Sequence, residues 1–262
     1  MELEIIDRRA EGAAHETPIL FIHGAWHGAW CWDEHFLRYF SRHGYPAHAL
    51  SLRGHGGSQG RERLRWTSIA DYVSDVAQAA GRLARPPVVV GHSMGGHVVQ
   101  KYLETHPAPG AVLLASVPHY GVLPATVRFA LRHPVAFARA NLTLSLYPLV
   151  ATTDLKREAF FPKNMPQAEI EQYAGLIQDE SYRAFLDMVI LNLPRPRRVT
   201  APVLVIGGDE DGLFRTGEFG ATASAYGTTA VIQPGAAHDL MLGSSWQIVA
   251  DVILAWLNER GI

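Results

Sequence analysis

The residues best suited to chemistry lie in the pentapeptide GHSMG, residues 91–95. It matches the pattern G-x-S-x-G, in which a sharp turn between a strand and a helix exposes a serine. The surrounding sequence fits that context, because the apolar run VVV precedes the pentapeptide and apolar residues at helical spacing follow it. The glycines leave room for neighbouring backbone beside the turn. We therefore interpret Ser93 as a nucleophile, the alternative being a serine that only caps the following helix.

A serine hydroxyl is a poor nucleophile until a base removes its proton, and a carboxylate must hold that base in one tautomer. The chain order that accompanies this kind of turn is serine, acid, histidine, which leaves His119, His133 and His238 beyond the serine's helix. Only His238 lies in a loop after a late predicted strand, in PGAAHDLML. We interpret His119 as pocket wall and His133 as surface, and predict that His238 is the general base.

Three acidic residues follow the strand pattern VLVIGG and could supply the carboxylate: Asp209, Glu210 and Asp211. The carboxyl ends of parallel strands meet at one edge of a sheet, so a residue here can reach a histidine in a neighbouring loop. Asp211 is far enough beyond the strand for its loop to curl back toward His238, whereas Asp209 is closer and could hydrogen-bond the turn. We predict Asp211 as the acid and expect one of the other two to be a solvated loop residue.

Attack of the serine on a carbonyl creates an oxyanion, which backbone N–H groups must stabilise. Met94 follows the nucleophile and supplies one donor by its position. The second donor is expected from the loop after the first predicted core strand, where Ala25 is the donor and Gly24 lets the backbone approach. The same stretch, HGAWHGAWCW, could instead be only a helix entry rich in core aromatics. Its three tryptophans are interpreted mainly as packing residues: Trp26, Trp30 and Trp32.

Short apolar segments predict the strands that position these residues. They are PILFIHG, AHALSL, VVV, AVLLAS near 111–116, PVLVIGG near 202–208 and TTAVIQPG. Apolar residues recur at helical spacing between Thr67 and Arg85, behind Thr67 or Ser68 as cap, and again from Trp246 to Leu257. This alternation predicts an α/β fold with a mostly parallel sheet and helices on both faces.

The pattern changes between Val117 and Arg198, where helical stretches are interrupted repeatedly by proline. We predict a helical cap over residues 118–198, inserted into a core formed by 1–117 and 199–262. A free helix pair would expose the cap's many apolar residues, so the cap should lie over the edge of the sheet. Its aromatic residues indicate a substrate with an apolar acyl or alcohol group, unless most of them only bury the cap against the core. These residues are Phe129, Phe137, Tyr147, Phe160, Phe161, Tyr173 and Phe185.

Five motifs together resemble those of the α/β-hydrolase superfamily: FIHGAWHGAWCW, SLRGHGGS, VVVGHSMGG, VIGGDEDG and AAHDLML. The HGA-x-HGAWxW opening is similar to that of its esterase and hydroxynitrile-lyase branch. The motifs extend over about residues 18 to 257 outside the cap. The resemblance implies the α/β-hydrolase fold and the same roles for the residues already assigned: Ser93, Asp211 and His238 as catalytic triad, and Ala25 and Met94 as oxyanion donors.

Two departures separate the chain from particular members of that superfamily. The lyases with this opening carry Thr where Gly24 stands and Lys where Asp239 follows the histidine, which disfavours cyanohydrin cleavage. Haloalkane dehalogenases use an aspartate as nucleophile, and Ser93 excludes that chemistry.

Composition narrows the partners and the compartment. A formal net charge of −2 gives no basic field for nucleic acid, so a small-molecule substrate fits best. The single cysteine, Cys31, excludes an internal disulfide, and the first residues lack a secretory signal, so we expect a cytoplasmic protein. No apolar run reaches the roughly 18 residues that a membrane span needs.

The sequence predicts neither a metal nor a cofactor. His23 and His27 lie four residues apart, but no acidic ligand lies between them, and neither HExxH nor a cysteine pair occurs. The glycines of GHGGSQG form no G-x-G-x-x-G that opens a helix. Cys31 lies on an apolar segment without a base of its own and is interpreted as a core residue rather than a nucleophile.

These observations favour a serine hydrolase that acts on carboxylic esters or related acyl substrates through an acyl-enzyme. The alternative from another class is a small-molecule receptor that binds a ligand beneath the cap with little turnover. Within the enzyme class, C–C bond hydrolysis and cofactor-free perhydrolysis use the same catalytic set.

Overall fold

The computed structural model describes residues 1–262 and contains one seven-stranded sheet. The strands lie in the order β1-β3-β2-β4-β5-β6-β7. β1 is antiparallel to β3 and every other pair is parallel, which confirms the mostly parallel sheet. The strands are β1 (Ile5–Arg8), β2 (Ile19–Ile22), β3 (Ala47–Leu50), β4 (Val88–His92), β5 (Ala111–Leu114), β6 (Val203–Gly208) and β7 (Ala230–Gln233).

Burial explains four of the six strands that the sequence predicts, while β7 was predicted from its apolar run although its residues are only partly buried. Every residue of β2, β4, β5 and β6 is buried, as continuous apolar runs in a sheet covered on both faces must be. β1, which no pattern predicted, is a half-exposed edge strand with the sequence IIDR and too few residues for a clear alternation.

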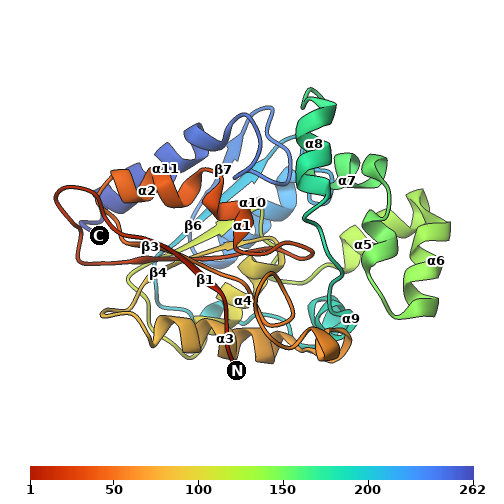
Figure 1. Ribbon diagram of the computed structural model, residues 1–262, viewed down its shortest axis with the longest axis horizontal. Coiled ribbons are helices and arrows are strands. Elements are labelled where there is room, and N and C mark those ends of the chain that lie inside the picture. Colours follow the sequence, from red (N-terminus) through yellow and green to blue (C-terminus); the bar gives the residue numbers. More distant parts are fainter.

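Helices cover both faces of this sheet (Figure 1). α2 (Phe36–Arg42) and α11 (Trp246–Glu259) pack together on one face, with the short α1 (Trp30–Asp33) beside α2. α3 (Ile69–Ala80) and α4 (Met94–Tyr102) pack together on the other. α10 (Thr216–Ala225) lies near α4. Tyr226, the residue after α10, donates a hydrogen bond from its hydroxyl to Gln100 Oε1 of α4 at 3.0 Å.

The predicted helix over 67–85 is shorter than expected. Ser68 caps α3 through a reciprocal pair of hydrogen bonds with Asp71, as the sequence indicated. The helix ends at Ala80 because Gly81 follows, and residues 81–85 form turns in which Leu83 no longer continues the helical face.

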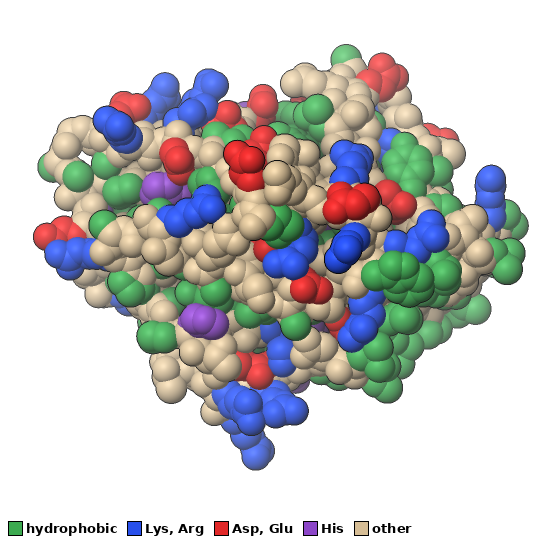
Figure 2. All heavy atoms as spheres, turned by 60° about the horizontal axis from the view of Figure 1, so that its bottom comes forward, with side chains coloured by type: hydrophobic (Ala, Val, Ile, Leu, Met, Phe, Trp, Pro, Cys, Tyr) green, Lys and Arg blue, Asp and Glu red, His purple; other side chains and the backbone are tan.

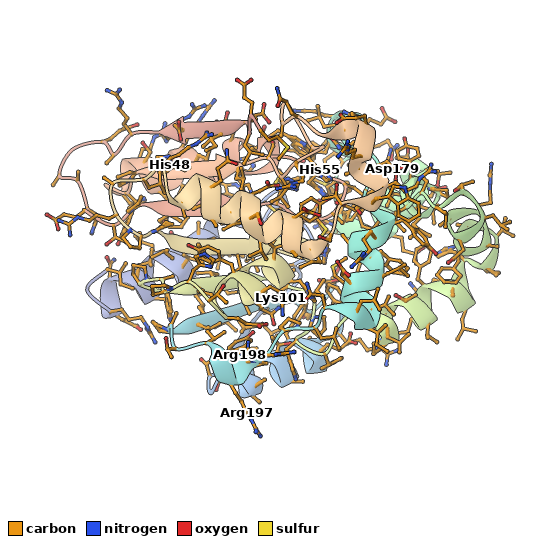
Figure 3. The ribbon with its side chains drawn as sticks, turned by 90° about the horizontal axis from the view of Figure 1, so that it is seen from below. His48, His55, Lys101, Asp179, Arg197 and Arg198 are labelled. Atoms are coloured by element: carbon orange, nitrogen blue, oxygen red, sulfur yellow. The ribbon has the colours of Figure 1, made fainter.

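Residues 118–198, which follow β5 and precede β6 along the chain, form helices and no strand (Figure 1). The helices are α5 (Leu123–Arg132), α6 (Pro134–Thr143), α7 (Thr153–Phe160), α8 (Gln167–Ala174) and α9 (Tyr182–Leu186), with short helical turns η2 (Tyr147–Val150), η3 (Asp187–Leu191) and η4 (Pro196–Arg198); a further turn, η1 (Arg61–Trp66), precedes α3. We call residues 118–198 the helical segment. Figure 3 shows its Asp179 close to His55 of the sheet-bearing part. None of the helices is both long enough and apolar enough to span a bilayer.

The helical segment covers its apolar residues on one side only. Phe129 and Phe137, on α5 and α6, line a pocket. Leu131, Val135 and Leu142 of the same two helices are 81%, 72% and 85% exposed, so the expectation that packing would cover this helix pair holds for only one side. Figure 2 shows hydrophobic side chains gathered on this part of the surface.

Candidate active site

Ser93 lies on a strained turn between β4 and α4. Its backbone angles are φ 51° and ψ −116°, which a residue with a side chain rarely adopts. Its N–H donates to Leu114 O at 3.0 Å and its carbonyl accepts from Val117 N at 3.1 Å, so the chain around the end of β5 holds the turn in place. The hydroxyl makes no capping hydrogen bond to α4. The interpretation of Ser93 as a helix cap is therefore wrong.

Close backbone packing around this turn requires glycine. A Cβ on Gly95 would lie 2.4 Å from the carbonyl oxygens of both Ile22 and His23, and one on Gly91 would lie 2.4 Å from Gly95 O. A Cβ on Gly24 would lie 2.7 Å from His92 Nδ1 and 3.0 Å from Ser93 Cβ. The loop after β2 therefore reaches the serine only because its residue 24 lacks a side chain.

His238 and Asp211 form a buried pair in the loops after β7 and β6. Nδ1 of His238 lies 2.7 Å from Asp211 Oδ2, and both side chains are almost completely shielded from solvent. The other oxygen of Asp211 accepts the N–H groups of Leu213 and Phe214, each at 2.8 Å. Nε2 of His238 is buried without a hydrogen-bond partner, and so is free to take a proton.

Asp209, the other aspartate of this loop, forms a hydrogen bond with the backbone of a turn and not with His238. Asp209 Oδ1 accepts the N–H of Gly235 at 2.7 Å and thereby braces the turn after β7. The structure thus pairs Asp211, and not Asp209, with the histidine.

His92 connects the serine turn to the loop of His238. Its Nε2–H donates to the carbonyl oxygen of His238 at 3.1 Å, and the two rings lie 4.8 Å apart between centroids. Burial lowers the pKa of His92 to about 3, so its ring stays neutral. His92, the residue before Ser93, is therefore hydrogen-bonded to the backbone of His238.

Two backbone N–H groups beside Ser93 have no acceptor within the protein. They belong to Ala25, in the loop after β2, and to Met94, the first residue of α4. Both residues line the same pocket as Ser93. An anionic oxygen formed at the serine can therefore take up both donors without breaking an existing hydrogen bond.

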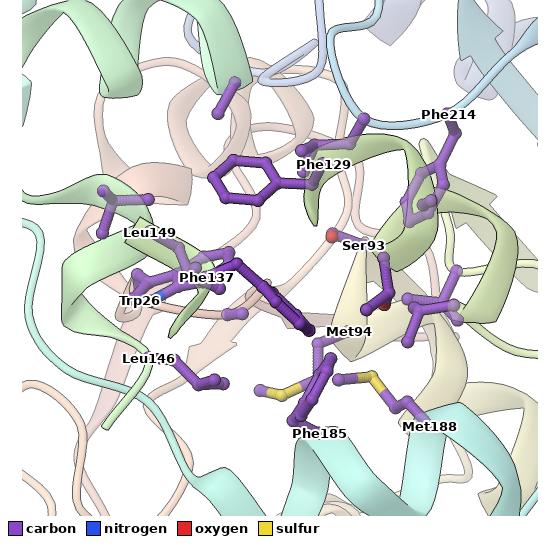
Figure 4. Close-up of a pocket in the computed structure, with 18 residues that line it drawn as sticks. Trp26, Ser93, Met94, Phe129, Phe137, Leu146, Leu149, Phe185, Met188 and Phe214 are labelled. Atoms are coloured by element: carbon purple, nitrogen blue, oxygen red, sulfur yellow. The ribbon is translucent and has the colours of Figure 1, made fainter. Parts of the chain in front are cut away.

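The pocket above Ser93 is almost wholly apolar (Figure 4). Sixteen of its eighteen lining residues are hydrophobic, the exceptions being Ser93 and Thr126, so it has no charged group to bind a charged substrate. The space between its lining atoms is about 770 Å³, part of it open to solvent, which suits a small organic molecule.

Some aromatic residues lie where expected and others do not. Phe129, Phe137 and Phe185 line the pocket, while the other four named from the sequence do not. Trp26, interpreted as packing, also lines it, and His119, interpreted as pocket wall, does not.

The sequence did not reveal a buried ion pair behind the pocket. His27 Nε2 lies 3.0 Å from Asp239 Oδ2, with both side chains inaccessible to solvent, and His27 Nδ1 donates to Ala25 O at 2.8 Å. Burial alone would lower the pKa of His27 and raise that of Asp239, but the partner's charge outweighs burial for each, so the pKa of His27 is raised, that of Asp239 is lowered, and the pairing favours the charged form of both. It joins the loop of Ala25 to the residue after His238.

His23, weighed as a metal ligand, and Cys31, weighed as a second nucleophile, are not available for those roles. His23 Nε2 accepts Leu52 N–H at 3.0 Å and its Nδ1 donates to Gly24 O at 2.7 Å, so neither nitrogen is free. Cys31 is fully buried, and burial raises the pKa of its thiol well above its usual value. A buried, protonated thiol is inert.

Buried neutral histidines predict acid sensitivity. Burial lowers the pKa of His97 to about 4, whereas an unfolded histidine titrates near 6.5. Below pH 6.5 the unfolded chain therefore binds a proton that folded His97 does not, and stability falls with pH by up to about 1.4 kcal/mol per unit for this residue. Between pH 6.5 and 5, the free energy of unfolding of His97→Gln should therefore fall by about 2 kcal/mol less than that of wild type. Urea unfolding at the two pH values measures this difference.

His27 does not obscure that comparison. Its raised pKa contributes stability that is fully present below pH 6.5 and is lost only as pH rises. Gln at position 97 can still donate to Asn192 O, the acceptor of His97 Nε2. Equal pH slopes for wild type and His97→Gln would show that His97 is protonated in the folded state.

Comparison with known proteins identifies the family to which this chain belongs. The model of the alpha/beta hydrolase family matches residues 19–252. A monoacylglycerol lipase of Mycolicibacterium smegmatis is 26% identical over 85% of this chain and 81% of its own, and a non-heme haloperoxidase of Rhodococcus erythropolis is 28% identical over 90% of each. The crystal structure of a putative non-heme bromoperoxidase from Mycobacterium tuberculosis superposes with a TM-score of 0.79 at 20% identity, over 99% of this chain and 97% of that one. Because the family model matches residues 19–252 of the 262 in this chain, the chain belongs to the alpha/beta hydrolases.

Proposed function

We propose that the protein is a serine hydrolase that cleaves carboxylic esters carrying an apolar group. The observation that carries this proposal is the arrangement at the base of the pocket, where Ser93 lies beside two unengaged N–H donors, those of Ala25 and Met94. A histidine with a free buried Nε2 and a carboxylate on its Nδ1 lies in the adjoining loops. Acyl transfer needs these four elements together.

In the first half of the reaction, His238 Nε2 takes the proton of Ser93 as Oγ attacks the ester carbonyl. The carbonyl oxygen becomes an oxyanion and accepts hydrogen bonds from the N–H groups of Ala25 and Met94. Asp211 stabilises the imidazolium by accepting from Nδ1. The proton then passes from Nε2 to the leaving alcohol oxygen, and the C–O bond breaks.

The acyl-enzyme is resolved by the same groups in reverse roles. His238 takes a proton from water, whose oxygen attacks the acyl carbonyl, and then returns the proton to Ser93 Oγ as the carboxylic acid leaves.

The pocket supports an apolar, uncharged acyl or alcohol group, because a buried charge without a partner would be costly there. We propose that the helical segment acts as a cap that forms this pocket, since it contributes eleven of the eighteen lining residues. The relative named as a monoacylglycerol lipase supports the ester class of substrate.

A p-nitrophenyl ester series of increasing acyl length tests the proposal. We expect release with a chain-length optimum set by the pocket, and slower turnover of esters with a charged acyl end, because the pocket offers that charge no partner. A fluorophosphonate should label Ser93. No release together with no labelling would contradict hydrolysis and favour a binding protein.

Perhydrolysis is the second candidate, and the haloperoxidase relative over 90% of each chain favours it. Hydrogen peroxide would then replace water in attacking the acyl-enzyme, forming a peracid. Peracid formation from a carboxylic acid and hydrogen peroxide measures this activity directly, and its absence in an enzyme that hydrolyses esters would leave hydrolysis alone.

A further inference from the structure

A buried carboxylate from the helical segment reaches the loop that carries Ala25. Glu180 is 1% exposed and accepts four hydrogen bonds. Oε1 accepts from the Tyr72 hydroxyl at 2.7 Å and from Ser181 N–H at 2.6 Å. Oε2 accepts from His55 Nε2 at 2.9 Å and from Trp26 N–H at 3.3 Å. Figure 3 shows the region, with His55 and the adjoining Asp179 labelled.

Trp26 is a strained residue that these contacts hold. Its φ is 67°, a left-handed value that an aromatic residue rarely adopts without support. The helical segment binds it at two points, because Glu180 accepts its N–H and its carbonyl accepts Gln178 N–H at 3.0 Å.

The peptide group between Ala25 and Trp26 is fixed at both of its polar atoms. Its N–H donates to Glu180, and its carbonyl oxygen, that of Ala25, accepts from His27 Nδ1 at 2.8 Å. The Ala25 N–H belongs to the preceding peptide, which meets this one at the Ala25 Cα, so fixing the Ala25–Trp26 peptide restricts the rotation that could turn that N–H away. A rotation of the Ala25–Trp26 peptide would break both hydrogen bonds.

Glu180 can hold the loop as an anion. Burial alone would raise the pKa of Glu180, but the facing His55, the Ser181 N–H and the Tyr72 hydroxyl together keep it below its usual value. Hydrogen bonds to an ionised acceptor are shorter and stronger than those to a neutral one.

We infer that Glu180 is a positioning residue for the oxyanion hole: from the helical segment it fixes the Ala25–Trp26 peptide so that the Ala25 N–H points at the oxyanion. The inference rests on the proposed function. It makes the seating of the helical segment and the completion of the oxyanion hole one event, since the segment that forms the pocket also holds the donor loop.

Glu180→Gln tests this inference, because glutamine keeps the shape but loses the charge and one acceptor. We expect kcat for the best p-nitrophenyl ester to fall about 10- to 100-fold, less than the 100- to 1,000-fold that loss of a whole oxyanion donor costs. KM should stay within about threefold, because Glu180 itself does not line the apolar pocket. Hydrogen–deuterium exchange of the peptide covering residues 24–28 should become faster.

Asp75→Asn is the matched control for a merely structural role. Asp75 is also a fully buried carboxylate, but it accepts hydrogen bonds from Arg53 and does not contact the Ala25 loop. We expect it to lower the unfolding midpoint while leaving kcat and loop exchange near wild type. Should Glu180→Gln fail to fold, Tyr72→Phe, which removes one donor to Oε1, should change kcat and exchange in the same direction but less.

The outcomes separate the two proposals. A wild type that cleaves no ester overturns the proposed function. Exchange of residues 24–28 that is equal in wild type and Glu180→Gln overturns the clamp, whatever the activity. Faster exchange with unchanged kcat overturns the positioning role, and so does a loss of kcat that Asp75→Asn reproduces at equal loss of stability.

Discussion

Ser93→Ala is expected to lose about 10⁵- to 10⁶-fold in kcat for the best ester, because the reaction then has no nucleophile. The fold should survive the change, since the hydroxyl of Ser93 makes no capping hydrogen bond and the residue is not wholly buried. Rates are measured with p-nitrophenyl esters, and fluorophosphonate labelling should vanish with them. Esterase activity that persists in Ser93→Ala would end the proposed mechanism.

Ser93→Gly serves as the companion variant. Alanine keeps the Cβ and therefore keeps the backbone strain at φ 51°, so removing the hydroxyl alone does not relieve it. Glycine adopts this conformation freely, and we expect Ser93→Gly to be about 1 kcal/mol more stable than Ser93→Ala while equally inactive. This comparison separates the strain of the turn from the chemistry of the side chain.

Most of the fold can be predicted from the sequence because buried elements have recognisable apolar patterns. β2, β4 and β5 are covered on both faces and read as apolar runs, and the glycines of GHSMG are required by carbonyl oxygens 2.4 Å from where a Cβ would be. Edge strand β1 pairs only with β3 and carries no such pattern. The other edge strand, β7, is also only partly buried, but its apolar run was enough to predict it.

The buried polar contacts around the site were beyond sequence reasoning because they join residues remote in the chain. His27 and Asp239 are 212 positions apart, and Trp26 and Glu180 are 154 apart. In the sequence, Asp239 is only the residue after a candidate histidine, and Glu180 stands in QDES, which is typical of a solvated turn. Their roles depend on contacts between the helical segment and distant loops, and residue spacing along the chain does not reveal such contacts.

Asp211→Asn should reduce kcat about 10⁴-fold, by inverting the tautomer of His238. Oδ1 of Asp211 accepts two backbone N–H groups, from Leu213 and Phe214, so the amide oxygen of an asparagine would take that position. Its NH₂ would then face His238 Nδ1, which could only accept. The ring proton would move to Nε2, where a base for Ser93 needs a lone pair. The kcat of the variant for p-nitrophenyl esters measures the effect.

Asp209→Asn is the matched control, two residues away on the same loop. Its carboxylate accepts one N–H, that of Gly235, and an amide oxygen can do the same, so we expect kcat within a few-fold of wild type. Both variants should keep their unfolding midpoints close to one another, because each retains its hydrogen bonds to backbone N–H groups. A larger loss at Asp209, or equal losses at both, would contradict the assignment of Asp211. A loss confined to Asp211 with stability intact would tie the effect to the imidazole proton, since the two substitutions remove the same charge from the same loop.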